Sequence, residues 1–167
     1  MNIAEIITIG DELLIGQTVD TNSAWIGMQL SMRGIRVNRI TSISDLREEI
    51  ITALDEALGR VPLVLVTGGL GPTSDDVTKQ TLAEYFGSSL VIDREVLAEV
   101  TERLARRNLE MNENNRRQAL VPDNCVVLAN RAGTAPGMLF EKEGRIIISM
   151  PGVPSEMKYI MQEHVLP

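Results

Sequence analysis

The stretch LVLVTGGLGPTSDD, residues 63–76, decides the fold of this chain. Its β-favouring apolar run, residues 63–66, breaks into a turn that contains Gly68, Gly69, Gly71 and Pro72, and a helical pattern follows. A strand that delivers a glycine-rich turn to a helix N-terminus presents backbone N–H groups that suit phosphate or another anion. Asp75 and Asp76 would repel a bare phosphate, so the stretch predicts a site that also uses a divalent cation or a proton transfer.

The simpler interpretation of this stretch is a tight βα loop in which Asp76 is an ordinary N-cap. A cap explains one acid but not three glycines. No Gly-Lys-Ser/Thr follows, so the P-loop of nucleotide triphosphatases is absent, and the glycine spacing does not fit the GxGxxG of dinucleotide-binding folds.

The composition predicts one domain, residues 1–167, with an aliphatic core. Hydrophobic residues make up 44% of the chain and aromatic residues only 3%. A formal charge of −7 argues against a nucleic-acid surface, because phosphate backbones need clustered Lys and Arg. The single cysteine, Cys125, excludes an intrachain disulfide, the N-terminus reads as a strand rather than a signal peptide, and no apolar run approaches the roughly 20 residues of a membrane span. We expect a cytoplasmic protein that does not engage membranes.

Strands and helices alternate in the first half of the chain. The patterns predict strands at 3–9, 35–43 and 61–67 and helices at 20–32 and 45–59. Asp45, with Glu48 as its capping-box partner, is expected to begin the second of these helices. This alternation predicts an α/β fold with a largely parallel sheet.

The second half is predicted to be helical at 77–86, 93–107 and 112–120 and then to form a hairpin. The hairpin covers 138–150, with a turn at 142–144, and residues 146–150 are expected to be a central strand because four apolar residues lie in a row. A last helix is expected to run to Pro167. It lacks a polar tail, so we expect the chain to be part of a longer protein.

The unusual residues follow predicted strands, where ligands bind in open α/β sheets. The first strand leads to Gly10, Asp11 and Glu12, the second to Ser44 and Asp45, and the last to Pro151, Gly152 and Pro154. Loops that merely cap helices would fit Asp45 best and Glu12 worst. The small-residue loop 130–138 either lets a flat ring lie against the backbone or simply makes a turn.

The remaining notable side chains are assigned no chemistry. His164 is expected at the surface, and Cys125, with no histidine nearby in the sequence, is not expected to be a nucleophile. Trp25, Tyr85 and Phe86 occupy apolar helical positions typical of a core. The arginines of residues 103–107 are expected to form a solvated face, with contact to a ligand phosphate as the alternative.

Five ordered motifs resemble the N-terminal domain of the CinA competence/damage-inducible family, which is itself similar to molybdopterin-binding domains. They are ITIGDELLIGQTVDTNSAWI, VTGGLGPTSDDVTKQTLAE, NENNRRQALVP, NRAGTAPGM and SMPGVPSEM. The resemblance implies a three-layer α/β/α sandwich and a homo-oligomer. It also implies metal-dependent ADP-ribose pyrophosphatase activity, which gives AMP and ribose 5-phosphate with Mg, Mn or Co and no organic cofactor. Full-length members continue into an amidase domain, so that activity is not expected of this chain.

The resemblance also implies the roles of individual residues. Asp76 and Asp45 match the catalytic pair, and Asp11, Asp75 and Asp76 would bind metal. The substrate would contact residues from five loops: Gly10, Asp11, Glu12, Asn22, Thr67, Gly68, Gly69, Leu70, Gly71, Pro72, Thr73, Ala135, Pro136, Gly137, Pro151, Gly152, Pro154 and Glu156.

Three functions stay open at this point. The first is a metal-dependent ADP-ribose hydrolase. The second is a domain of molybdenum cofactor metabolism that binds or transfers a pterin nucleotide. The third is a non-catalytic nucleotide-binding module that regulates another domain.

Overall fold

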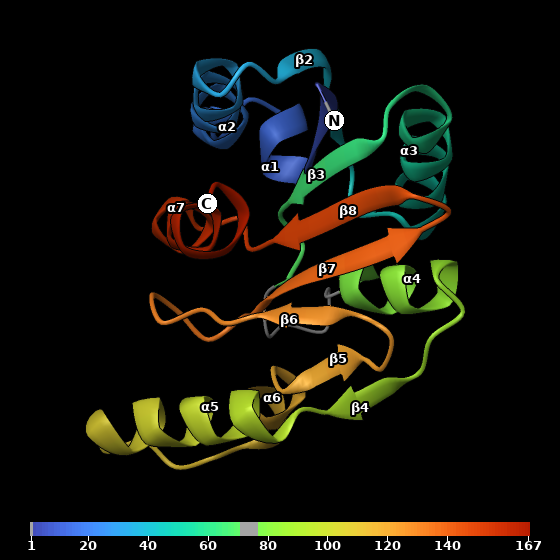
Figure 1. Cartoon of the computed structure of the whole chain (residues 1–167). Coiled ribbons are helices and arrows are strands. Elements are labelled where there is room, and N and C mark those ends of the chain that lie inside the picture. The colour runs from blue at the N-terminus through green and yellow to red at the C-terminus, as the bar shows by residue number, and fades with distance from the viewer. Residues whose placement is uncertain (1, 71–76) are drawn as a thin grey trace.

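The computed structural model describes residues 2–70 and 77–167, and its centre is a six-stranded sheet (Figure 1). All five residues of β3 are buried, as its uninterrupted apolar run requires of a strand covered on both faces. The strands lie in the order β2-β1-β3-β8-β7-β6. Their bounds are Ile3–Ile9 for β1, Arg36–Ile43 for β2, Leu63–Thr67 for β3, Val126–Leu128 for β6, Gly137–Lys142 for β7 and Arg145–Met150 for β8.

The sheet is mostly parallel, as predicted. Strands β1, β2, β3 and β8 run in one direction, and β7 is antiparallel to both β8 and β6. The carboxyl ends of the four parallel strands therefore lie along one edge. Because β7 runs the other way, the loop that enters β7 reaches this same edge.

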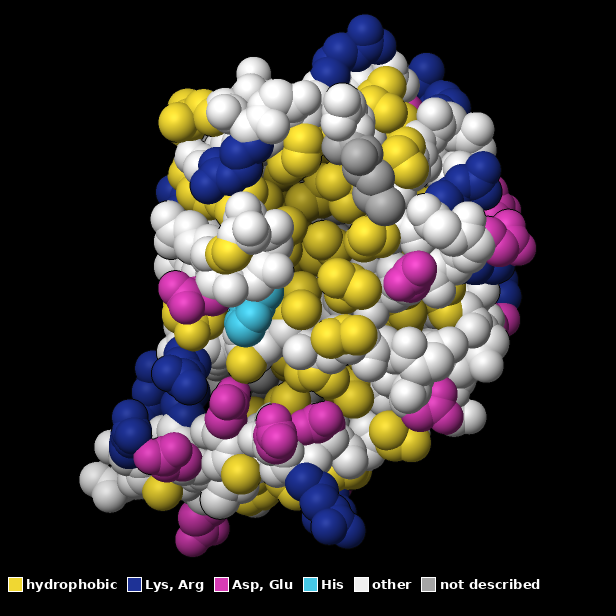
Figure 2. Space-filling view, in the orientation of Figure 1, with side chains coloured by type: hydrophobic (Ala, Val, Ile, Leu, Met, Phe, Trp, Pro, Cys, Tyr) yellow, Lys and Arg dark blue, Asp and Glu magenta, His cyan; other side chains and the backbone are white. Residues whose placement is uncertain are grey.

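Helices cover both faces of the sheet, which confirms the predicted three-layer sandwich. On one face α2, Thr21–Met32, and α7, Pro154–Ile160, pack through Ile26, Leu30, Met157 and Ile160. On the other face α3, Arg47–Arg60, and α4, Val77–Tyr85, cover a second core cluster. Figure 2 shows hydrophobic side chains gathered over the middle of the viewed face, with charged side chains around them.

A small lobe extends from the α4 side of the sheet. Strands β4, Leu90–Ile92, and β5, Leu120–Pro122, pair antiparallel, and α5, Arg94–Arg106, and α6, Glu113–Arg117, lie between them in the chain (Figure 1). Val96, Val100 and Leu104 recur along α5 at helical spacing and form a separate core cluster with Ala119. The lobe thus has an apolar core of its own beside the main sheet.

Asp45 does not cap the following helix, so the predicted capping box with Glu48 is wrong. The helical bond from Ile50 N to Leu46 O (3.1 Å) makes Leu46 the cap residue, and no side chain of the described residues bonds to this helix start. Asp45 lies instead in a bend after β2. Gly59 does not end the helix either, because α3 continues to Arg60.

Other elements depart from the prediction mainly where they are short. Strands β4, β5 and β6 have three residues each, too few to show a period, and the helix expected at 112–120 spans only Glu113–Arg117. A short helix α1, Asp11–Leu14, follows β1, and α7 runs on into a π-helical turn, η1, Met161–Val165. Among the described residues, no helix has the length and apolar character needed to cross a membrane.

Candidate functional site

A cavity of about 90 Å³ opens at the carboxyl edge of the sheet, beside the ends of β1, β3 and β8. The chain passes from β1 to β2, which lies on one side of β1, and then to β3, which lies on the other side of β1. The direction in which strands are added to the sheet therefore reverses between β1 and β3. Ligands of open α/β sheets bind at such a reversal. The cavity is lined by Thr8, Ile9, Glu12, Leu13, Thr18, Val19, Asp20, Thr21, Asn22, Thr67, Gly68, Gly152 and Pro154.

Asn22 ties three segments together at this cavity. It is 9% exposed, and its Nδ2 donates to Thr67 Oγ1 (3.1 Å) and to Gly152 O (2.8 Å). Thr67 Oγ1 in turn donates to Pro151 O (3.0 Å). The start of α2 and the ends of β3 and β8 are thus locked together, and the backbone around the cavity is fixed before any ligand arrives.

Gly68 and Gly152 let two backbone segments come very close. At Gly68, where φ is +109°, an added Cβ would lie 2.1 Å from Ile9 O, and a Cβ at Gly152 would lie 3.2 Å from the Gly68 Cα. The Gly68 N–H already donates to Met150 O (3.0 Å), so it is not free for a phosphate. Gly68 therefore shapes the cavity wall and does not supply an anion donor.

Gly69 makes a similar close approach to the first turn of α4. Its φ is +68°, and a Cβ there would lie 2.0 Å from Thr78 Oγ1. Thr78 Oγ1 and Asn22 Oδ1 are buried without a hydrogen-bond partner among the described residues. Buried polar atoms are nearly always paired, so each is a candidate contact for a ligand or a bound water.

Three of the acidic residues that the sequence singled out, Asp11, Glu12 and Asp45, follow the ends of β1 and β2 at the same edge. Asp11 and Glu12 are exposed in the first turn of α1, and Gly10 N, just before them, donates to Ile43 O (3.1 Å) at the end of β2. Half-buried Asp45 follows two residues after Ile43. Among the residues that the structure describes, no three His, Cys, Asp or Glu side chains form a group that could hold a metal ion. The predicted site residues Gly71, Pro72, Thr73, Asp75 and Asp76 lie outside the described residues.

The predicted site residues Ala135, Pro136, Gly137 and Glu156 lie in or beside the loop that enters β7, and Asn130 holds this loop in place. Asn130 is 4% exposed, and its Oδ1 accepts from Ala132 N (3.0 Å) and Gly133 N (3.1 Å). Its Nδ2 donates to Ala135 O (2.8 Å) and to Glu156 Oε2 (2.6 Å) in the first turn of α7. One buried amide therefore fixes this loop and joins it to α7.

The predicted residues of this loop do not line the edge cavity. Ala135 is buried, Pro136 lines a small separate recess with Val96 and Asn130, and Gly137 packs against Ile160, where a Cβ would lie 3.1 Å from the Ile160 side chain. Leu70 is buried in the core cluster on the α3 side. Pro151 contributes its carbonyl to Thr67, and Pro154 lines the edge cavity.

Thr78 and Asn130 were not predicted as site residues. Asn130 precedes a run of small residues, where an asparagine that hydrogen-bonds to nearby backbone N–H groups is a common loop device, so a signal for its role was present. Thr78 gave no signal, because only the fold brings its hydroxyl against Gly69.

The histidine and the aromatic side chains lie where the sequence predicted. Burial raises the pKa of the Cys125 thiol to about 11, which keeps it protonated near neutral pH. His164 is exposed, and one ring nitrogen contacts Ala129 O (2.9 Å). Phe86 stacks on Phe140 of the core with ring centroids 4.2 Å apart, and Tyr85 and Trp25 also pack against core clusters.

The fold and its edge define the class of this protein: an α/β/α domain with a mostly parallel sheet and a cavity at the carboxyl ends of its strands. The family model described as "Probable molybdopterin binding domain" matches residues 5–167. The chain belongs to this molybdopterin-binding-like family, and within it to the CinA-like proteins, as its sequence motifs indicated.

Individual relatives agree with this assignment. A CinA-like protein from Cytophaga hutchinsonii is 52% identical over 96% of this chain, and one from Flavobacterium psychrophilum is 47% identical over 98%. The chain spans only 38% and 40% of the length of these two proteins. The crystal structure of CinA from Thermoplasma acidophilum is 36% identical, with a TM-score of 0.87 over 96% of this chain and 94% of that one.

A more distant structure shares the fold alone. MoaB from Pyrococcus furiosus, a tungsten cofactor synthesizing protein, is 21% identical, with a TM-score of 0.63 over 97% of this chain and 89% of that one.

Proposed function

We propose that this domain binds ADP-ribose at the carboxyl edge of its sheet and hydrolyses it to AMP and ribose 5-phosphate with a divalent metal. The observation that carries the proposal is the cavity at the reversal of strand order, where the Asn22 network holds the strand ends together. At about 90 Å³ the cavity would take a phosphate group of the ligand rather than the whole molecule. The close approaches at Gly68 and Gly152 support it further, since they leave no room for side chains at these two positions of the cavity lining. The resemblance of the five sequence motifs to the CinA family implies the same activity.

The proposed reaction needs an attacking water and a carboxylate that accepts its proton. A water oxygen attacks one phosphorus, the P–O–P bridge breaks, and the bridging oxygen leaves with the other phosphate. A carboxylate takes the proton of the water, and we assign that role to Asp76, with Asp45 as its partner. The one histidine, His164, is exposed on η1 and contacts the Ala129 carbonyl, which supports an acid rather than an imidazole as the base.

The proposed metal would neutralise charge on the phosphate oxygens. Its proposed ligands are Asp11, Asp75 and Asp76, of which only Asp11 belongs to the described residues. Asp11 is exposed at the same edge, and oxygen donors suit Mg²⁺ or Mn²⁺. The described carboxylates do not by themselves make a metal site.

The test is to incubate the protein with ADP-ribose and each of Mg²⁺, Mn²⁺ and Co²⁺, with a chelator as control, and to separate the products by ion exchange. We expect AMP and ribose 5-phosphate in equal amounts, and none with the chelator. ADP-ribose that binds in calorimetry but stays intact with every metal would refute hydrolysis and favour the regulatory module.

Binding of a pterin nucleotide is the second candidate. It is supported by the family model, whose description names molybdopterin. The edge cavity would then take the phosphate end of the pterin nucleotide. Titration with molybdopterin and with ADP-ribose in parallel separates the two candidates, since the first proposal requires turnover of ADP-ribose and the second requires tight molybdopterin binding without it.

We also propose a homo-oligomer, most simply a dimer with two-fold symmetry. Met28 and Met32 on α2 are 53% and 73% exposed, more than large apolar side chains usually are. Light scattering should give about twice the chain mass, and Met28→Lys/Met32→Lys should shift the protein toward monomer. A monomeric parent at high concentration would contradict this.

A further inference from the structure

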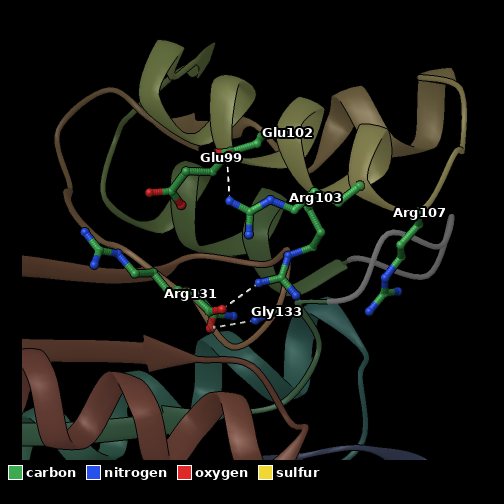
Figure 3. Close-up of a pocket in the computed structure, with 8 residues that line it drawn as sticks. Glu99, Glu102, Arg103, Arg107, Arg131 and Gly133 are labelled. Carbon is green, nitrogen blue, oxygen red and sulfur yellow. Dashed lines mark hydrogen bonds and ion pairs between the residues drawn. The ribbon is translucent and has the colours of Figure 1, made fainter.

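A larger hollow, of about 580 Å³, lies between α5 and residues 130–133 and is separate from the edge cavity. Figure 3 shows side chains from α5 reaching toward the loop that carries Arg131 and Gly133. Four arginines line it, Arg103, Arg106, Arg107 and Arg131, together with Glu99 and Glu102. This volume is in the range of small-molecule sites and is too large for a single ion.

The charge of this hollow is opposite to that of the whole chain. Among the described residues that line the hollow, Glu102 accepts from Arg106 (2.6 Å), which leaves Arg103, Arg107 and Arg131 against the carboxylate of Glu99. The hollow is therefore locally cationic in a chain whose formal charge is −7. Among the described residues, the guanidinium groups of Arg107 and Arg131 have neither an ion pair nor a hydrogen bond.

Stabilisation of the α5 C-terminus explains only part of this arrangement. Arginines in a last helical turn interact favourably with the helix dipole, which accounts for Arg103 and Arg106. Arg131 belongs to a different segment, and its backbone carbonyl accepts a hydrogen bond from Arg103 Nη2 (2.6 Å). That bond holds the end of α5 against the loop. Arginines from both segments therefore line the same hollow.

The loop that presents Arg131 is built to stay in place. Asn130 makes four hydrogen bonds around it while buried, and a Cβ at Gly133 would lie 2.0 Å from the Glu156 carboxyl carbon. Guanidinium groups on a fixed frame match the oxygens of a phosphate, to which arginine donates two parallel hydrogen bonds.

We propose that this hollow is a second binding site, which takes a phosphate-bearing small molecule through Arg103, Arg107 and Arg131. The ligand is a nucleotide, a sugar phosphate or pyrophosphate, since the volume admits more than one phosphate group. The inference does not depend on hydrolysis at the edge cavity, because binding alone is required.

The test is calorimetric titration with pyrophosphate, AMP and ribose 5-phosphate, with adenosine and ribose as uncharged probes. We expect the phosphates to bind, the uncharged probes not to bind, and Arg107→Gln/Arg131→Gln to weaken binding about 10-fold or more. Arg94→Gln is the matched control, because Arg94 is exposed at the other end of α5 and does not line the hollow. This control should stay within about 2-fold of the parent.

A variant of the edge cavity separates the two sources of phosphate binding. If Asn22→Asp abolishes pyrophosphate binding while Arg107→Gln/Arg131→Gln leaves it intact, the phosphate binds at the edge cavity and the proposal is overturned. Equal weakening by Arg94→Gln, or adenosine that binds as tightly as AMP, also overturns it. Loss confined to the double arginine variant, with amide NMR shifts at residues 130–133, supports it.

Discussion

The edge cavity and the hollow beside α5 are linked through the first turn of α7, but different kinds of groups shape them. Pro154 lines the cavity, and Glu156, two residues on, accepts from the Asn130 that lines the hollow. At the cavity, close backbone contacts at Gly68 and Gly152 and the buried Asn22 amide hold the strand ends together, whereas the hollow is lined mainly by charged side chains on a helix end and a loop. Substitutions at the cavity should therefore lower the stability of the domain. Substitutions at the hollow should weaken ligand binding and leave the stability of the domain unchanged.

The largest effect is expected from Gly68→Val. Its Cβ would meet Ile9 O at 2.1 Å, a backbone atom that cannot move without shifting β1, and the positive φ adds strain. We expect a loss of about 3 kcal/mol or more in the free energy of unfolding, measured by urea denaturation.

Gly59→Ala is the matched control for Gly68→Val. A Cβ at Gly59 meets nothing within 4 Å, and the residue lies inside α3, so alanine should stabilise by about 0.5–1 kcal/mol. If Gly68→Val were as stable as the parent, the backbone would not be packed as described and the cavity wall would not depend on glycine.

Asn130→Asp should sharpen the link between the two regions. It removes the donor to Ala135 O and Glu156 Oε2 and puts a second carboxyl where Glu156 is now 2.6 Å away. We expect a loss of about 3 kcal/mol near pH 7.5. Like charges raise the pKa of the new carboxyl pair in the folded variant, so the folded state binds protons more tightly and the loss shrinks as the pH falls toward about 5.

The parent should show no such recovery on acidification. The hydrogen bond from Arg60 lowers the pKa of Glu5, so this contribution to stability is complete above the ordinary glutamate pKa of 4.5 and is lost as the pH falls through the lowered value. Chemical denaturation of both proteins between pH 7.5 and 5 measures the difference. A pH-independent loss in Asn130→Asp would mean that Glu156 moves away from the new carboxylate.

A smaller effect is expected from Asn22→Asp. The substitution removes the donor that Thr67 Oγ1 and Gly152 O share and should cost about 2 kcal/mol. Asn112→Asp is its control, because among the described residues Asn112 bonds only through its Oδ1, which accepts from Asn115 N (2.8 Å), and aspartate caps helices equally well. Equal melting temperatures for the two variants would show that the Asn22 network does not hold the cavity together.

The same contrast explains what the sequence could predict. Buried parallel strands read as apolar runs and glycines mark close backbone approaches, so the sheet and the edge of the cavity were accessible from residues 3–9 and 63–69. The lobe was not, because three-residue strands such as β4 and β5 carry no period and exist only through their pairing.

The arginine hollow needed the tertiary structure as well. Arg103 and Arg131 are 28 residues apart in the sequence, and only the packing of α5 against the β7 entry loop brings them together. The Asp45 cap failed for a local reason, since an aspartate two residues before a helix resembles a cap in sequence while the backbone makes Leu46 the cap residue.

The central claim, hydrolysis at the strand ends by a pair of acids, is tested most directly by the kinetics of Asp76→Asn and Asp45→Asn. ADP-ribose turnover would be measured under saturating metal, beside melting temperatures and an Asp123→Asn control that removes the same charge at an exposed site near β5. The account predicts that Asp76→Asn loses at least about 100-fold in kcat, that Asp45→Asn loses less, and that all three variants melt near the parental temperature. Parental rates in both Asp76→Asn and Asp45→Asn would contradict the account.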